Sequence, residues 1–293
     1  FAGWRVDLVA EVTLERWTTH MQSLRFADFA LLGMDAWGLF FALRRLYFNV
    51  LTVAGSQPQA TLTAARARRS RGPRSVAIGG GTGLPALLSG LKGFTDNLTA
   101  VVTVADDGGS SGRLRQDLNI LPPGDLRNCL VALADTEPLM GQLFQHRFRS
   151  RGALGGHSFG NLFIAALTEV TGDFGEAVRA SSKVLAISGQ VLPVTFDDVR
   201  LTAVLTGGRK VQGESRISAA GGHIESLRLE PADARANPEV LQAIAKADAI
   251  VLGPGSLYTS ILPNLLVPGV AKAVERSGAI KILACNIMTQ PGE

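Results

Sequence analysis

The chain has few of the residues that build disulfides and histidine-ligated metal sites. Its 293 residues include two cysteines and four histidines, and neither cysteine has another cysteine or a histidine nearby at metal-ligand spacing. Cys129 lies inside a predicted apolar helix and Cys285 inside a predicted apolar strand, so we expect both to be core thiols. Low cysteine content suits a reducing compartment, and we expect a cytoplasmic protein.

Net positive charge is also confined to one segment. The formal net charge is +4, but five arginines lie between Arg66 and Arg74, a stretch without an acidic residue. The rest of the chain therefore carries 4 − 5 = −1. Basic motifs interleaved with aromatic residues are absent from the remainder, so we expect no nucleic-acid partner.

No apolar run is long enough to cross a bilayer as a helix. Residues 29–43 are mostly apolar, but Asp35 interrupts them and Arg44 ends them after about 15 residues, short of the ~20 that a span needs. We expect a helix in residues 29–55 that contacts a membrane surface or a partner. A membrane anchor and a poorly ordered extension are the alternatives.

Changes in composition divide the chain into three parts. We predict an apolar helical extension over residues 1–56, a basic linker over 57–73 and an α/β domain over 74–293. The chain begins with Phe1 and stops directly after a predicted strand, where an α/β protein normally continues, so we expect a fragment at both ends.

The most informative segment is a glycine-rich turn between a strand and a helix. Strand 75–78 runs into Gly79, Gly80, Gly81, Thr82 and Gly83, and apolar residues then recur at helical spacing. Glycine lets amide groups approach an anion closely, and the following helix adds its positive dipole end. No Lys-Ser or Lys-Thr pair follows, which excludes a P-loop. A dinucleotide fingerprint fits only in its alanine variant, with Asp106 near the ribose position, and a tight crossing without a ligand is the alternative.

Three further loops carry polar residues at strand ends or helix starts. The loop after the second strand places Asp106, Asp107, Ser110, Ser111 and Arg113 together, which suits phosphates, Mg²⁺ held by Asp106 and Asp107, or both. A solvated turn whose acids cap the next helix is the alternative. His157, Ser158 and Asn161 precede another helix, where His157 is either a general acid or base or a polar capping group. Gly253, Pro254, Gly255, Ser256, Tyr258 and Thr259 form the last such loop, and Asn286 follows the final strand.

These elements predict a doubly wound, Rossmann-like, mainly parallel sheet with a β-hairpin extension and an N-terminal helical extension. Ligands of such sheets bind beyond the carboxyl ends of the strands, where the loops converge. Residues 191–229 are predicted as hairpins that extend the main sheet, separated by two Gly-Gly pairs, and their role is structural. Asp125 is predicted as the N-cap of a helix that ends near Ala134, and another helix is predicted over 138–148.

The motifs GGGTGL, ADDGGSSGRLR, LPPGDLRNCLVALAD, GHSFGNL and ADAIVLGPGSLYTSILPNLLVPG together closely resemble the bacterial gluconeogenesis factor family, the YvcK-like proteins. The resemblance covers residues 73–293. This family shares a superfamily with the 2-phospho-L-lactate transferases, the CofD-like proteins. The loop of Asp106 to Arg113 and the Gly255-Ser256 pair depart from the transferase pattern, which puts the deazaflavin reaction in doubt.

The resemblance implies a cleft for a nucleotide diphosphate. It implies UDP-N-acetylglucosamine or a related UDP-sugar as ligand, with NAD(P) also reported in the family, and a role in cell shape and in growth on gluconeogenic carbon. In one hypothesis the ligand regulates contacts with protein partners, with its diphosphate over residues 80–83 and 253–256 and Arg127 and Asn161 assisting; Asn128 is a further candidate for ligand binding. In the other, Asp106 or Asp107 holds Mg²⁺ for a phosphotransferase, with Asp106, Asp107 and His157 as catalytic candidates; a nicotinamide oxidoreductase ranks last. Large apolar helices favour a homodimer.

Overall fold

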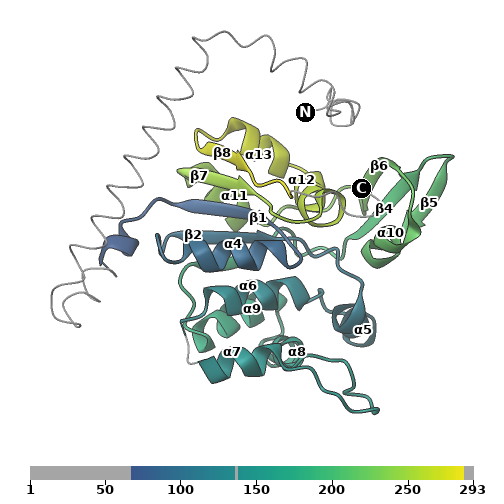
Figure 1. Cartoon of the computed structure of the whole chain (residues 1–293), viewed down its shortest axis with the longest axis horizontal. Helices are drawn as coiled ribbons and strands as arrows, with labels where there is room; N and C mark the ends of the chain where they lie inside the picture. The colour runs from purple at the N-terminus through teal and green to yellow at the C-terminus, as the bar shows by residue number, and fades with distance from the viewer. Residues whose placement is uncertain (1–66, 136–137, 287–293) are drawn as a thin grey trace, which may run out of the picture. The chain divides into compact units, whose positions relative to one another are not determined.

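The computed structural model describes residues 67–135 and 138–286 (Figure 1). The predictions for residues 1–56, for the first part of the basic linker and for Met288 lie outside the described residues. Contacts divide the chain into two units, Phe1–Ala67 and Arg68–Glu293. The second unit contains the predicted α/β domain.

A five-stranded parallel sheet forms the centre of this unit. Its strands are β1 (Ser75–Gly79), β2 (Leu98–Val102), β3 (Gln190–Pro193), β7 (Ala249–Leu252) and β8 (Ile280–Leu283), in the order β3-β2-β1-β7-β8. The chain first adds strands on one side of β1 and later on the other, so the direction of winding switches between β1 and β7. The predicted doubly wound parallel sheet is confirmed, and this switch point is where such folds open a crevice.

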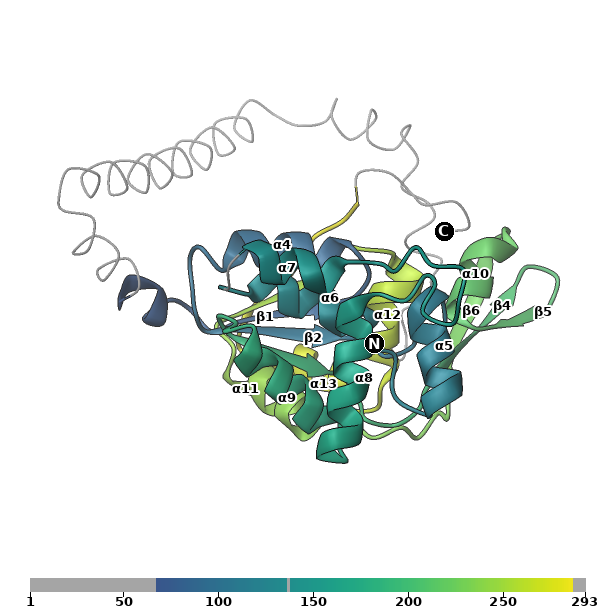
Figure 2. The same cartoon turned by 90° about the horizontal axis from the view of Figure 1, so that it is seen from below.

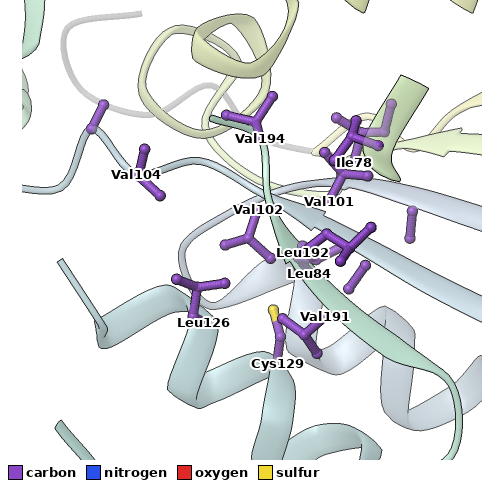
Figure 3. Packing of buried hydrophobic residues seen from close by; sticks show 14 of the residues in the cluster. Ile78, Leu84, Val101, Val102, Val104, Leu126, Cys129, Val191, Leu192 and Val194 are labelled. Atoms are coloured by element: carbon purple, nitrogen blue, oxygen red, sulfur yellow. The ribbon is translucent and has the colours of Figure 1, made fainter. Parts of the chain in front are cut away.

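Helices cover both faces of the sheet because right-handed crossovers that proceed in opposite directions fall on opposite faces. On one side lie α4 (Gly83–Leu91) and α6 (Gly124–Leu133), and on the other α11 (Pro238–Lys246) and α13 (Val270–Arg276) (Figure 2). Both central strands, β1 and β2, are buried along their whole length. Ile78, Leu84, Val101, Leu126, Cys129 and Val191 belong to one cluster of buried core residues, with Ile78 and Val101 on one side of the strands and Leu126 and Cys129 on the other (Figure 3). This burial on both faces explains why the strands are continuously apolar.

The remaining helices surround this core. They are α5 (Gly109–Leu118), α7 (Pro138–Gln145), α8 (Phe159–Thr171), α9 (Phe174–Val184), α12 (Leu262–Leu266) and a one-turn π-helix, η2 (Leu257–Ile261). The predicted helix 138–148 ends earlier, at Gln145. Among the described residues no single helix is long and apolar enough to span a bilayer; η2 and α12 combined with α13 reach that length only across an 84° bend.

The segment predicted as hairpins from the main sheet folds differently. Only β3 joins the main sheet; β4 (Arg200–Leu205), β5 (Arg209–Gln212) and β6 (Ile224–Glu230) form a separate antiparallel sheet in the order β5-β4-β6. The pair at Gly207 does turn a hairpin, but a helix, α10 (Glu214–Ala220), separates β5 from β6. Only Ile217 of α10 is buried, so the helix has too short an apolar stripe to be recognised in the sequence.

The two cysteines differ in environment. Cys129 is buried as predicted, but Cys285 is exposed, which corrects the prediction of a second core thiol. The reason is that Cys285 follows β8, an edge strand of the described sheet whose four residues are all exposed. An apolar strand sequence does not reveal whether the strand lies at the centre or the edge of a sheet.

Candidate functional site

The loops after β1 and β7 touch at the carboxyl edge of the sheet. A Cβ atom at Gly83 would lie 2.4 Å from the carbonyl oxygen of Pro254, and one at Gly80 would lie 2.7 Å from Oδ2 of Asp125. Gly81 has a φ of +63° and Gly253 a φ of +82°, which disfavour other residues. Close packing and backbone conformation therefore account for these glycines even before a ligand is considered.

The side chain of Asp125 accepts a hydrogen bond from a backbone amide of the glycine-rich turn. The Gly81 amide donates to Asp125 Oδ2 over 2.7 Å. The predicted N-cap role of Asp125 is wrong: Pro123 is the N-cap residue of α6, and Asp125 lies one position inside the first turn. Burial, together with the charge of Asp106, raises the pKa of Asp125 to about 6, although the Gly81 bond and Arg127 lower it in part. The anion closest to the turn is thus a side chain of the protein.

Asp106, Asp125 and Glu214 form a carboxylate cluster near this turn. Burial raises the pKa of Glu214 to about 8, and the charges of Asp106, Asp125 and Asp107 add to this effect. A hydrogen bond with Thr259 lowers the pKa in part. Glu214 belongs to α10, in the segment predicted to be purely structural. No sequence pattern near Glu214 points to this position, because only the packing of the second sheet brings α10 to the first.

The adjacent acids Asp106 and Asp107 have separate roles. Asp106 Oδ1 accepts a hydrogen bond from the Gly108 amide at 2.8 Å. Asp107 Oδ1 accepts one from the Ser215 amide at 2.9 Å, which fastens α10 to the loop after β2. The alternative that these acids cap the next helix is wrong, because the N-cap residue of α5 is Gly108 and no side chain caps that helix; Asp107 instead accepts from the first turn of α10.

The fit to a metal depends on how many carboxylates are available. In the described ranges, no group of three or more His, Cys, Asp or Glu side chains is arranged to hold a metal ion. Mg²⁺ commonly binds one or two carboxylates and completes its shell with water and phosphate oxygens. Asp106, Asp107 and Asp125 each accept one backbone hydrogen bond, so none is excluded by its contacts, and Asp106 and Asp125 are the pair beside the glycine turn.

A buried polar network joins α5, α6 and α8. Ser110 Oγ lies 3.0 Å from His157 Nδ1, where the tautomer of His157 decides which of the two donates, and it accepts from Asn161 Nδ2 at 3.0 Å. Ser158 caps α8, and its hydroxyl accepts a hydrogen bond from Arg127. Burial and the charge of Arg113 lower the pKa of His157, although the charge of Asp117 raises it in part, and this favours the neutral imidazole. Both alternatives for His157 stay open, since its polar partners are now known but no proton transfer is shown.

Arg127 is the buried cation of this region. Its second Nη donates to Asn128 Oδ1 at 2.6 Å, and its Nε is buried without a partner in the described part of the chain. Burial lowers the pKa of Arg127 to about 10, with the charge of Arg147 adding to this effect, so the side chain remains positive at pH 7. Arg113 is more exposed and donates to the Gly155 carbonyl at 2.8 Å.

The loop after β7 is held by hydroxyl and amide side chains. Ser256 caps η2 by accepting from the Thr259 amide at 3.2 Å, and Asn286 donates to the Gly255 carbonyl at 3.1 Å. Asn264, which sequence reasoning missed, is fully buried and donates to the Gly79 and Ser260 carbonyls. Asn264 lies just after the π-turn of η2, and π-turns occur often at functional sites. The sequence contains no pattern from which this π-turn could be predicted.

The structure brings most of the predicted residues to one edge of the sheet. Those on the loops after β1, β2, β7 and β8, and near the starts of α5, α6, α8 and η2, are Gly79, Gly80, Gly81, Thr82, Gly83, Asp106, Ser110, Ser111, Arg127, Asn128, His157, Ser158, Asn161, Gly253, Pro254, Gly255, Ser256, Tyr258, Thr259 and Asn286. Asp107 and Arg113 make their contacts away from the glycine turn. That these residues bind a ligand remains a prediction.

Comparison with known proteins shows which families this chain resembles. The family model described as 2-phospho-L-lactate transferase CofD matches residues 76–293. A gluconeogenesis factor of Bacillus subtilis is 54% identical over 221 residues, which are 75% of this chain and 70% of that protein. A relative from Nostoc is 59% identical over 229 residues, or 78% of this chain.

A solved structure agrees with this result. A crystal structure of a Bacillus halodurans protein, 54% identical, aligns with a TM-score of 0.74 and covers 76% of this chain and 72% of its own. The present chain spans about half the length of its relatives from Nostoc and Clostridium acetobutylicum. The sheet, the loops and the extent of these matches lead to one conclusion: the chain belongs to the CofD family and, within it, to the gluconeogenesis factors.

Proposed function

We propose that the chain binds a nucleotide diphosphate sugar, with UDP-N-acetylglucosamine as the first candidate, as a regulatory ligand. The observation that carries this proposal is the meeting of the loops after β1 and β7 at the switch point of the sheet, beside the N-terminus of α4. Binding would change a surface that protein partners contact and so support cell shape and growth on gluconeogenic carbon. The proposal includes a cytoplasmic homodimer, with residues 29–55 as the membrane contact.

The carboxylate cluster sets a condition on this binding. A diphosphate placed at the glycine turn would lie beside Asp125, which already accepts from Gly81. Like charges at such distances repel strongly in a partly buried site. Either Mg²⁺ held by Asp106 and Asp125 or a proton on Asp125 would relieve that repulsion. We therefore include Mg²⁺ in the proposal.

Calorimetric titration of the full chain tests the proposal. UDP-N-acetylglucosamine, GDP and NADP⁺ are each added with and without Mg²⁺, and the ligand is recovered and analysed afterwards. Tight binding of the sugar nucleotide, strengthened by Mg²⁺ and with the ligand intact, is expected. Failure of all three nucleotides to bind a folded protein would refute a nucleotide site, and selective NADP⁺ binding would replace the sugar nucleotide with a dinucleotide.

A second function is a Mg²⁺-dependent phosphotransferase of the 2-phospho-L-lactate transferase type. The observation that favours it is Glu214, whose pKa of about 8 leaves it protonated at neutral pH beside two other carboxylates; such perturbed groups cluster at catalytic sites. An acceptor hydroxyl would form the new P–O bond, its proton would pass to a carboxylate, and the nucleotide phosphate would leave. Consumption of GDP-linked donor, lost in Glu214→Gln with nucleotide affinity retained, would support this function over the regulatory one.

A further inference from the structure

A cavity of about 310 Å³ lies between α5, β4 and α10, away from the glycine turn. Arg115 and Gln116 line it from α5, Arg200 from β4, and Ser215 and Arg216 from α10, with Asp107 on its wall. We call it the arginine cavity. Three cationic side chains from three elements converge on it, against one carboxylate.

Within the described residues neither Arg200 nor Arg216 makes a direct ion pair, although Asp107 Oδ2 and Arg216 Nε both lie close to Gly213. Neither guanidinium group has a hydrogen bond in residues 67–135 and 138–286. Glu230 stands opposite Arg200 in the register of β4 and β6, but its carboxylate accepts from Gln212 Nε2 at 2.7 Å. Two unpaired arginines that face one cavity repel each other, so the site favours an added anion.

Arg115 supplies a buried third cation. The residue is 6% exposed, and its side chain donates to Asp198 and to the Val199 carbonyl and has a buried Nε without a partner in the described chain. Asp198 offsets part of this charge, and Asp107 already accepts from the Ser215 amide. The donors around the cavity therefore outnumber its acceptors.

We propose that the arginine cavity is a second ligand site, which binds a small phosphate-bearing anion. The planar guanidinium fork matches phosphate oxygens in pairs, and arginine is the common residue for such recognition. A volume of about 310 Å³ is at the lower end of the ~300–1,000 Å³ of small-molecule pockets. The site thus suits free phosphate, pyrophosphate or a small phosphorylated metabolite and not a nucleic acid.

The position of the cavity links it to the carboxylate cluster. Asp107 Oδ1 holds the amide of Ser215, the residue after Glu214, and Arg115 makes a long contact of 3.5 Å with the Asp106 carbonyl. An anion that draws Arg216 towards Arg115 would hold α10 against α5. It would thereby fix Glu214 in the cluster, so that occupancy of one site changes affinity at the other.

Titration of the full chain with inorganic phosphate and pyrophosphate tests this proposal. The double variant R200A/R216A removes the two unpaired cations from the cavity. The control is Arg228→Ala, since Arg228 is an exposed arginine on β6 of the same sheet and does not line the cavity. We expect about tenfold or greater loss of affinity in the double variant, because it removes charge-assisted hydrogen bonds, and no change in the control. No binding to the wild type, or equal losses in both variants, would overturn the proposal.

Two additions separate the cavity from the nucleotide site. Phosphate is titrated again in the presence of saturating UDP-N-acetylglucosamine and Mg²⁺; persistence of binding supports a distinct site, and complete competition assigns the phosphate to the glycine turn and refutes the proposal. Gln116→Trp fills the cavity without changing its charge and is expected to abolish phosphate binding, which keeps the test decisive if R200A/R216A does not fold. Circular dichroism establishes folding in each case.

Discussion

Two neighbouring regions of this protein carry opposite charge, and adjacent residues belong to them. Asp106 joins Asp125 and Glu214 in the carboxylate cluster at the sheet edge, whereas Asp107 reaches α10 on the wall of the arginine cavity. Consecutive side chains of an extended segment point in opposite directions. A pair of acids that reads as one metal site in the sequence therefore serves two regions.

The cluster and the cavity differ in what surrounds them. The carboxylate cluster rests on tightly packed glycine loops, so substitutions there meet backbone. The arginine cavity is formed partly by exposed side chains of α10 and β4, so substitutions there change charge with little change in packing. Four substitutions test this contrast, from the largest expected effect to the smallest.

Gly83→Val is expected to have the largest effect. Its Cβ would lie 2.4 Å from the Pro254 carbonyl oxygen, and the backbone must shift, at a cost of about 3 kcal/mol in the free energy of unfolding. Gly90→Ala is the matched control in α4: its Cβ meets nothing within 4 Å, so we expect a gain of up to about 1 kcal/mol. Urea unfolding measures both, and equal stability of the two variants would contradict the contact between the loops.

Glu214→Gln is expected to stabilise the protein at alkaline pH. The folded-state pKa of Glu214, about 8, lies above its ordinary value, so the wild type loses stability as pH rises through this range, while a glutamine does not. Because Glu214 is partly exposed, we expect a gain of only about 1–2 kcal/mol at pH 9 and none at pH 4. The difference in urea unfolding between these pH values is the test; a pH-independent difference would place Glu214 outside the cluster.

Asp125→Asn is expected to change the pH dependence of nucleotide binding. Without Mg²⁺, wild-type affinity should rise as pH falls from 8 to 5, since Asp125 becomes neutral near its pKa of about 6. With Mg²⁺ the trend should reverse, because protonation removes a metal ligand. Each change is expected to be about tenfold, or 1.4 kcal/mol. Calorimetry at the two pH values should show neither trend in the variant; a trend that survives would assign the titration to another group.

Asp107→Asn is expected to have the smallest effect and to act mainly on the cavity, although loss of its charge also removes one of the smaller causes that raise the pKa of Glu214. The amide oxygen of asparagine can still accept from Ser215, so the free energy of unfolding should change by less than about 1 kcal/mol. Loss of the negative charge should tighten phosphate binding a few-fold. Phosphate titration with Asp107→Asn and the wild type measures this, and weaker binding in the variant would mean that Asp107 is not beside the anion.

Much of the parallel sheet was predictable because each strand and helix carries its own local signal. The apolar runs of β1, β2 and β7, the glycines that follow them and the Asn-Pro start of α11 indicate their elements without reference to the rest of the chain. The antiparallel sheet was predicted less well. The helix α10 buries only Ile217, and a single buried residue gives no period to detect.

The candidate site divides in the same way. The sequence alone determined that three glycine-rich loops would end strands of one parallel sheet, because glycine, hydroxyl and carboxylate residues mark such loops locally. Only the tertiary structure decided that Asp125 occupies the Gly81 amide, that Glu214 joins Asp106, and that Arg115, Arg200 and Arg216 share a cavity. These meetings join residues far apart in the chain, and their energies depend on distance and burial, which exist only once the layers have packed.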